Sequence, residues 1–178
     1  MVKATLKSLK QFLESQDMKC TFIPKSEEIP IDQVFVYMGQ DDSDRDLLLQ
    51  IRVVEQELEG VELQGVTKKN MSYHHMHFLV NLPLKINEHC IGDVARMVLL
   101  LNKSLSVPGF EFSEVDRMVY YRYVLMTSGG RFNGNIVMSI IGMIMFNIDV
   151  FSKTIEDVGT GARTLVEVVE EAQKAATQ

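Results

Sequence analysis

The best candidates for metal-binding side chains are the histidines of the segment Tyr73-His74-His75-Met76-His77. This segment holds three of the four histidines in the chain. Side chains alternate between the two faces of a strand, so His75 and His77 would share one face while His74 points to the other. Two imidazoles can contribute to a metal site, but such sites take about three or four ligands. No nearby Cys or His completes a familiar ligand pattern. We therefore predict a solvated or edge strand over residues 73–77 and no metal site.

Other catalytic patterns are missing from the sequence. No serine lies in a nucleophile elbow, and neither cysteine carries a local catalytic signature. Glu111, Glu114 and Asp116 surround an expected hairpin turn, where acidic residues serve solubility and turn formation. The glycine-containing segment 129–135 lacks the Lys and the Ser or Thr of a P-loop. We predict no catalytic residue and no cofactor.

Composition and charge bound the class of protein. The chain has 178 residues, of which 46% are hydrophobic and 24% charged, as in a folded globular protein, and we predict a single domain over residues 1–178. The net charge is -6, and the short basic cluster Lys68 and Lys69 is too small to neutralise phosphates, so we predict no nucleic-acid partner. Cys20 and Cys90 form no paired framework, which favours reduced thiols and a cytoplasmic location.

The most hydrophobic segment covers residues 136–146 and is interrupted only by Ser139 and Gly142. Its length of about eleven residues is well short of the ~20 that a membrane-spanning helix needs. The N-terminus has no apolar stretch of the kind found in a secretory signal. We predict a buried helix here and no membrane span.

The first half of the chain reads as a helix followed by strands. Strands are predicted over residues 19–23, 34–38, 47–54 and 72–82, with an acidic turn at 41–46. An N-terminal amphipathic helix precedes them, because one helical face collects the apolar residues Val2, Leu6, Leu9, Phe12 and Leu13. Glutamates that alternate with apolar residues over 55–63 extend the third strand toward a turn near Gly60 or Gly65.

The second half contains a strand, helix, hairpin unit over residues 78–126, which identifies the fold best. Its helix is predicted over 91–105, followed by the turn signal Pro108-Gly109 and by hairpin strands at 110–112 and 119–125. A long helix over about 133–152 and a C-terminal helix over about 162–175 are separated by Gly159-Thr160-Gly161. Strands in runs predict an α+β fold, with helices packed on a twisted antiparallel sheet.

The helix over 133–152 is the predicted partner-binding element. It is apolar around much of its circumference, and such a helix is either deeply buried or part of an interface. Methionine has a flexible, polarizable side chain that adapts to different partners. The predicted partner-binding residues are Met138, Ile141, Met143, Met145 and Phe146. For any single methionine, core packing is the alternative interpretation.

Several segments of the second half carry a resemblance to a known family. They are Leu101-Asn102, Gly109-Phe110-Glu111-Phe112, Val119-Tyr120-Tyr121-Arg122-Tyr123, and Asp149 with Ile155, Val158 and Gly159. With these segments the chain resembles the YbjN family, bacterial proteins described as regulators of sensory transduction. That family is similar in fold to the type III secretion chaperones, which are dimers that hold an extended segment of a client. The resemblance is firmest over residues 78–161.

The resemblance implies a chaperone-like α+β domain without a known catalytic site. It transfers no functional residue, because the shared positions, including Asn102, Phe110 and Arg122, have the character of fold determinants. The C-terminal helix and the histidine-rich strand lie outside the shared pattern. We therefore expect a non-catalytic, chaperone-like or regulatory protein that binds a protein client or forms a homodimer through apolar sheet and helix surfaces.

Two other classes of function stay open. The first is an enzyme or ligand-binding domain with a pocket between sheet and helices, where Arg122, Tyr121 or His75 would supply polar groups. A deep cavity with convergent ionisable side chains would favour it. The second is a structural subunit of a larger assembly, which would have a large apolar interface and no independent client.

Overall fold

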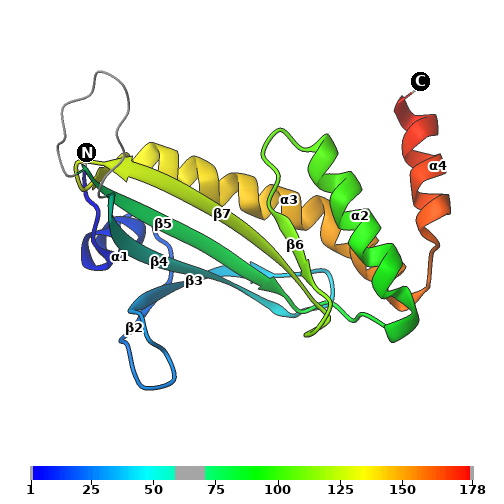
Figure 1. Cartoon of the computed structure of the whole chain (residues 1–178), viewed down its shortest axis with the longest axis horizontal. Helices are drawn as coiled ribbons and strands as arrows, with labels where there is room; N and C mark the ends of the chain where they lie inside the picture. The colour runs from blue at the N-terminus through cyan, green and yellow to red at the C-terminus, as the bar shows by residue number, and fades with distance from the viewer. Residues whose placement is uncertain (1, 59–70, 177–178) are drawn as a thin grey trace. The chain divides into compact units, whose positions relative to one another are not determined.

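A computed structural model describes residues 2–58 and 71–176, and it confirms the predicted α+β class (Figure 1). The first half contains β1 (Val2–Lys3), α1 (Leu6–Glu14), β2 (Cys20–Ile23), β3 (Gln33–Gln40), β4 (Asp46–Leu58) and β5 (Met71–Leu82). The second half contains the 3-10 helix η1 (Glu88–Cys90), α2 (Ile91–Ser104), β6 (Phe110–Ser113), β7 (Met118–Ser128), β8 (Arg131–Phe132), α3 (Gly134–Thr160) and α4 (Leu165–Ala176).

Six strands form one antiparallel sheet in the order β2-β3-β4-β5-β7-β6. The predicted strand, helix, hairpin unit corresponds to β5, α2, β6 and β7, and the hairpin places β7 beside β5 and leaves β6 at the edge. The two hairpin strands pair with Phe110 opposite Tyr121 and Phe112 opposite Val119. The predicted turn near Gly60 or Gly65 and the cluster Lys68 and Lys69 lie outside the described residues.

Contacts divide the chain into two compact units. The first comprises Met1–Met38, Leu48–Leu79 and Tyr123–Gly142, and the second comprises Gly39–Leu47, Val80–Arg122 and Met143–Gln178. Each has its own set of fully buried apolar side chains, such as Leu13, Ile51 and Phe78 in the first and Phe110 and Ile148 in the second. The single domain over residues 1–178 stays a prediction.

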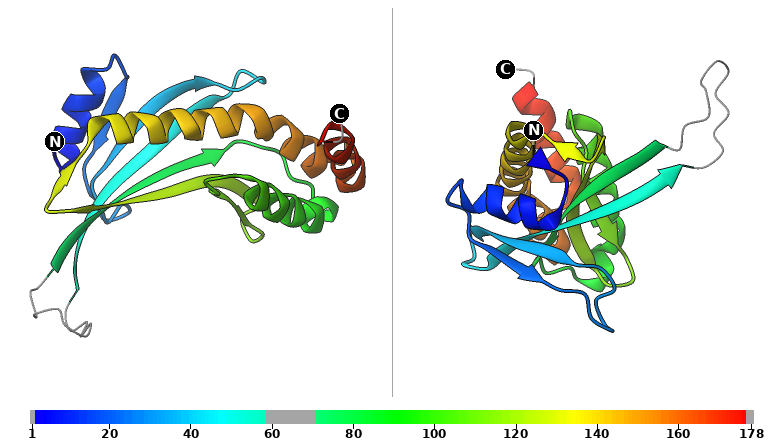
Figure 2. Two further views of the ribbon diagram at one scale, coloured as in Figure 1. Left: turned by 90° about the horizontal axis from the view of Figure 1, so that it is seen from above. Right: turned by 90° about the vertical axis from the view of Figure 1, so that its left-hand side faces the viewer.

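In the first unit, α1 lies beside β2 and buries Leu9 and Leu13 (Figure 2). The prediction that Val2 belongs to this helix is wrong, since Val2 lies in β1 and pairs with Phe132. The cause is Thr5, whose backbone is extended and whose Oγ1 accepts a hydrogen bond from the amide of Ser8 at 3.2 Å. This N-cap starts the helix at Leu6 and leaves the preceding residues free to form a strand.

In the second unit, the hairpin is anchored by Tyr121, which is fully buried. Its hydroxyl donates to the carbonyl of Val107 at 3.0 Å and accepts from Nδ2 of Asn147 at 3.0 Å. Its ring meets Phe110 edge-on with centroids 4.9 Å apart. A Cβ at Gly109 would lie 2.4 Å from this ring, so the turn before β6 requires glycine.

The long helix α3 continues to Thr160, and the predicted end at residue 152 is therefore wrong. Gly159 remains helical because the helix packs there against Lys85 and Ile86. Asn87 satisfies the terminal carbonyls, since its amide N–H donates to Gly159 O at 2.8 Å and its Nδ2 donates to Thr160 O at 2.9 Å. Gly161 then has φ +77, the left-handed conformation that commonly ends helices.

The start of the C-terminal helix was also predicted a few residues early. The helix α4 begins at Leu165 and not at residue 162. Thr164 precedes it, and its Oγ1 accepts from the amide of Glu167 at 3.2 Å, while the Glu167 carboxylate accepts from the amide of Thr164 at 2.8 Å. This reciprocal pair is a capping box, and it fixes the first turn.

Two glycines of α3 offer a matched test of this packing. In a helix interior, Gly→Ala ordinarily stabilises by about 0.5–1 kcal/mol. We expect that gain for Gly142→Ala, because no atom other than the adjoining residues and the backbone of its own helix lies within 4 Å of the added Cβ. We expect Gly159→Ala to destabilise by about 1–3 kcal/mol, because its Cβ would lie 2.4 Å from Ile86 Cδ1 and 2.9 Å from Lys85 O. Urea unfolding measures the change in unfolding free energy of each variant, which should be positive for Gly142→Ala and negative for Gly159→Ala. Equal changes in the two variants would contradict this prediction.

Candidate functional site

The predicted partner-binding residues lie on different sides of α3. Ile141 is 1% exposed and belongs to the core, so it offers no surface to a partner. Met138 and Met143 are half-buried, whereas Met145 and Phe146 are exposed. The exposed Val150, one turn beyond Phe146, was not among the predicted residues.

The exposed apolar residues Met145, Phe146 and Val150 form what we call the α3 surface. Phe146 is 64% exposed, the largest exposed fraction of the three. The opposite side of the helix is buried, and its residues recur at helical spacing: Val137, Ile140, Ile141, Ile144 and Ile148. Each residue advances about 100° around a helix, so Phe146 lies roughly 200° from Ile144 and faces away from the core. The helix therefore has both a core-facing side and an apolar outward-facing side.

The helix α3 extends well beyond the apolar segment over residues 136–146 on which the sequence prediction about membrane spanning was based. It has 27 residues and a mean hydropathy of 1.7 over its most apolar 18-residue window. Among the described residues it is the one helix long and apolar enough to cross a membrane, judged by length and composition alone. A core helix meets the same criterion, and one third of that window is buried within the protein.

The histidines of β5 alternate as predicted, but β5 lies between β4 and β7, so the edge-strand alternative for residues 73–77 is wrong. The rings of His75 and His77 lie on one face with centroids 6.1 Å apart. Nε2 of His74 is 4.0 Å from a carboxylate oxygen of Glu55, and its buried Nδ1 has no hydrogen-bond partner in the described part of the chain. No group of three or more His, Cys, Asp or Glu within residues 2–58 and 71–176 is placed to hold a metal ion. The absence of a metal from this protein stays a prediction.

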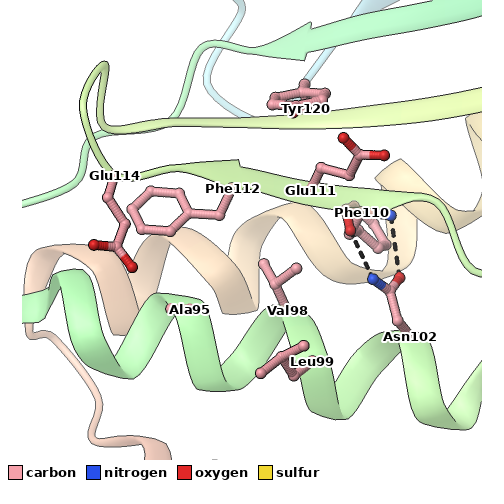
Figure 3. Close-up of a pocket in the computed structure, with 9 residues that line it drawn as sticks. All are labelled: Ala95, Val98, Leu99, Asn102, Phe110, Glu111, Phe112, Glu114 and Tyr120. Carbon is pink, nitrogen blue, oxygen red and sulfur yellow. Dashed lines mark hydrogen bonds between the residues drawn. The ribbon is translucent and has the colours of Figure 1, made fainter.

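An open groove of about 430 Å³ lies between α2 and the edge strand β6 (Figure 3). It is lined mainly by apolar side chains, together with an amide, a phenol and two carboxylates. The lining residues are Ala95, Val98, Leu99 and Asn102 from α2, Phe110, Glu111, Phe112 and Glu114 from β6 and its turn, and Tyr120 from β7. Sequence reasoning assigned no site here, because the approach of α2 to β6 depends on tertiary packing.

One end of the groove is closed by Asn102. Its Nδ2 donates to the carbonyl of Phe110 at 2.6 Å, and its Oδ1 accepts from the amides of Phe110 at 3.1 Å and Gly109 at 3.2 Å (Figure 3). The side-chain amide thus satisfies both backbone groups of Phe110, as a neighbouring strand would. Asn102 therefore joins α2 to the edge of the sheet.

The two carboxylates of the groove differ in their partners. Glu111 accepts from Nε of Arg122 at 2.7 Å, and this hydrogen bond raises the pKa of the guanidinium above its ordinary value. The pKa of Tyr120 is also raised, first by its hydrogen bond to Glu111 and second by burial. Glu114 is exposed and has no ion pair among the described residues, and its carboxylate lies on the α2 side of β6 (Figure 3). The groove is therefore negatively charged at the Glu114 end.

A separate cluster of charges surrounds Arg45 in the second unit. Its guanidinium forms a bidentate pair with Glu156, with N···O distances of 2.7 and 2.8 Å, and donates through Nε to Asp41 at 2.7 Å. Nη1 also donates to the carbonyl of Pro83 at 2.6 Å. These bonds join the turn between β3 and β4 to the segment after β5 and to α3. The saturated hydrogen bonding identifies the cluster as a structural clamp.

The pKa values of the clamp reflect this bonding. The hydrogen bond from Arg45 holds the pKa of Glu156 below its ordinary value, against the effect of burial, and the amide of Lys85 assists. Burial alone would raise the pKa of Asp41, but hydrogen bonds from the amides of Arg45 and Ser43 and from the guanidinium lower it. Both carboxylates are therefore charged at neutral pH.

No protein-family model matches the chain, and no curated protein matches it in sequence. What the surfaces can bind is therefore inferred from the geometry of the described residues.

Proposed function

We propose that this protein is a non-catalytic binding module, chaperone-like or regulatory, that holds a protein partner on the α3 surface. The partner is a second copy of the chain or a segment of a client. The same proposal includes a cytoplasmic location, the absence of a membrane span and the resemblance to the YbjN family.

The observation that carries the proposal is the exposure of Phe146 beside Met145 and Val150. Aromatic residues and methionine are enriched in protein interfaces, where they supply large contact areas. Covering the exposed parts of these three side chains would contribute about 5 kcal/mol at roughly 25 cal/mol per Å². A partner that covers the α3 surface therefore removes an unfavourable contact with water.

The groove and the clamp supply no evidence for catalysis. Tyr121, which the enzyme alternative named as a polar group, is committed to Val107 and Asn147 in the core. Arg122, the second such group, pairs with Glu111. These contacts favour structural roles for both residues and support a binding function over an enzymatic one.

Substitution of Phe146 with glutamate tests self-association through the α3 surface. We expect the native protein to sediment as a dimer and Phe146→Glu to raise the dimer dissociation constant at least ~10-fold, because a buried carboxylate would meet an apolar partner. The unfolding free energy of the monomer should change by no more than about 0.5 kcal/mol, since the side chain is exposed.

The matched control is Val166→Glu on α4, where the valine is 65% exposed. It places the same charge on an exposed apolar position of a different helix, and we expect less than a ~2-fold change in the dissociation constant. Equal dissociation constants for the native protein and Phe146→Glu would contradict self-association through this surface.

A further inference from the structure

The edge strand β6 leaves backbone hydrogen-bonding groups without a strand partner. The amide of Arg122 donates to Gly109 O at 2.7 Å, which makes this opposed pair hydrogen-bonded. In an antiparallel ladder such pairs alternate with pairs whose N–H and C=O point outward. Phe110 and Phe112 are the outward-pointing residues of β6. Because β6 is the last strand of the sheet, no strand of the described chain pairs with them.

These two residues differ in what lies beside them. The outward groups of Phe110 are occupied by the side-chain amide of Asn102. Beyond Phe110, the groove separates β6 from α2, and Phe112 lies above Ala95 and Val98 of α2 (Figure 3). The outward N–H and C=O of Phe112 therefore border a groove that α2 does not fill.

We propose that the groove between α2 and β6 accepts an extended, basic segment of a partner protein, which pairs with the backbone of Phe112 and adds a strand to the sheet. Strand addition to an exposed edge is a recurring mode of peptide recognition, in which backbone hydrogen bonds supply affinity and pockets for alternate side chains supply specificity.

The side chains of the groove determine the chemistry of this segment. Val98, Leu99 and Phe112 form an apolar wall for every second side chain of an added strand. Glu114 places a carboxylate at the open end, and no Lys or Arg is among the lining residues. A lysine or arginine of the segment would meet this carboxylate. The segment is thus extended, apolar at alternate positions and basic at the position near Glu114.

The inference goes beyond the proposed function, because it assigns a second binding surface with its own class of ligand. The α3 surface and the groove share no residue. If no peptide binds to the groove, Phe146→Glu can still weaken self-association. If Phe146→Glu has no effect on self-association, a peptide can still bind to the groove. The two proposals can therefore fail separately.

Titration with a defined peptide tests the inference. The probe is an end-blocked seven-residue peptide with lysine at both ends, valine at positions 3 and 5 and threonine at the even positions, so that the valines and lysines share one face of the strand. Fluorescence anisotropy with the full chain measures its affinity at low ionic strength. We expect binding that is weakened at least ~10-fold when lysine is replaced by glutamate, since like charges would meet at Glu114. N-methylation of all internal peptide amides should abolish binding, because it removes every backbone donor that the added strand could offer to β6.

Variants of the protein locate the site. We expect Leu99→Glu to weaken binding at least ~10-fold and Leu100→Glu less than ~2-fold, because Leu99 lines the groove and Leu100, also exposed on α2, does not. Phe112→Pro should weaken binding further than Phe112→Ala. Both remove the ring, but only proline removes the outward N–H, and an edge strand tolerates that loss.

Three results would overturn the inference. They are no measurable binding of the valine-lysine peptide, equal binding of its N-methylated form, and equal affinities of Leu99→Glu and Leu100→Glu. The peptide comparison uses the native protein, so it decides the matter even where Phe112→Pro fails to fold.

Discussion

Tyr121→Ala is expected to lower the free energy of unfolding by about 4 kcal/mol. Truncation of a large buried aromatic side chain costs about 3–5 kcal/mol, because the lost contacts and the residual cavity add. Tyr121 is fully buried, packs edge-on against Phe110, and fills the space over Gly109. Denaturant unfolding monitored by circular dichroism measures the effect.

A second substitution separates the hydroxyl from the ring. Tyr121→Phe keeps the aromatic packing but leaves the carbonyl of Val107 and Nδ2 of Asn147 without this partner. An unsatisfied buried polar group costs about 1–3 kcal/mol. We expect a loss of about 2 kcal/mol, smaller than that of Tyr121→Ala. Equal losses for the two variants would show that the ring contributes nothing.

Arg45→Met is expected to lower the free energy of unfolding by about 3 kcal/mol. The substitution keeps an unbranched side chain of similar length but leaves the mostly buried carboxylates of Asp41 and Glu156 without their shared cation. Lys153→Met is the control, since Lys153 is 60% exposed and pairs with the single carboxylate of Asp157, and its loss should cost less than about 0.5 kcal/mol. Equal effects would contradict the clamp.

The clamp also predicts a pH dependence. Because Asp41 and Glu156 have lowered pKa values in the folded protein, their stabilisation is complete above the ordinary carboxyl range near ~4. It is lost as the pH falls through the lowered pKa values. The stability difference between the native protein and Arg45→Met should therefore be constant near neutral pH and shrink below about pH 4. A difference that grows on acidification would contradict this assignment.

Local sequence patterns predicted most elements because their causes are local. The apolar spacing of α2 and the turn signal at Pro108-Gly109 place the helix and the hairpin without tertiary information. The end of α3 could not be predicted this way, because Gly159 resembles a helix terminator. Only its packing against Lys85 and Ile86 explains why the helix continues.

The two proposed binding surfaces were predicted less completely. The residues of α3 are apolar on several faces, so their spacing could not separate the buried Ile141 from the exposed Phe146. The β6 edge depends on ladder register and on the contact from Asn102, neither of which has a sequence signal. The Arg45 clamp joins residues 111 positions apart, beyond the reach of local pattern.

The most direct test of the protein-binding function is photocrosslinking from position 146 in living cells. A benzophenone-bearing phenylalanine replaces Phe146 in one variant and Val166, an exposed residue of α4, in a control variant. We predict a discrete crosslinked protein species from position 146, either a second copy of the chain or one defined partner, and none from position 166. No protein crosslink from position 146, or the same species from both positions, would contradict the proposed function.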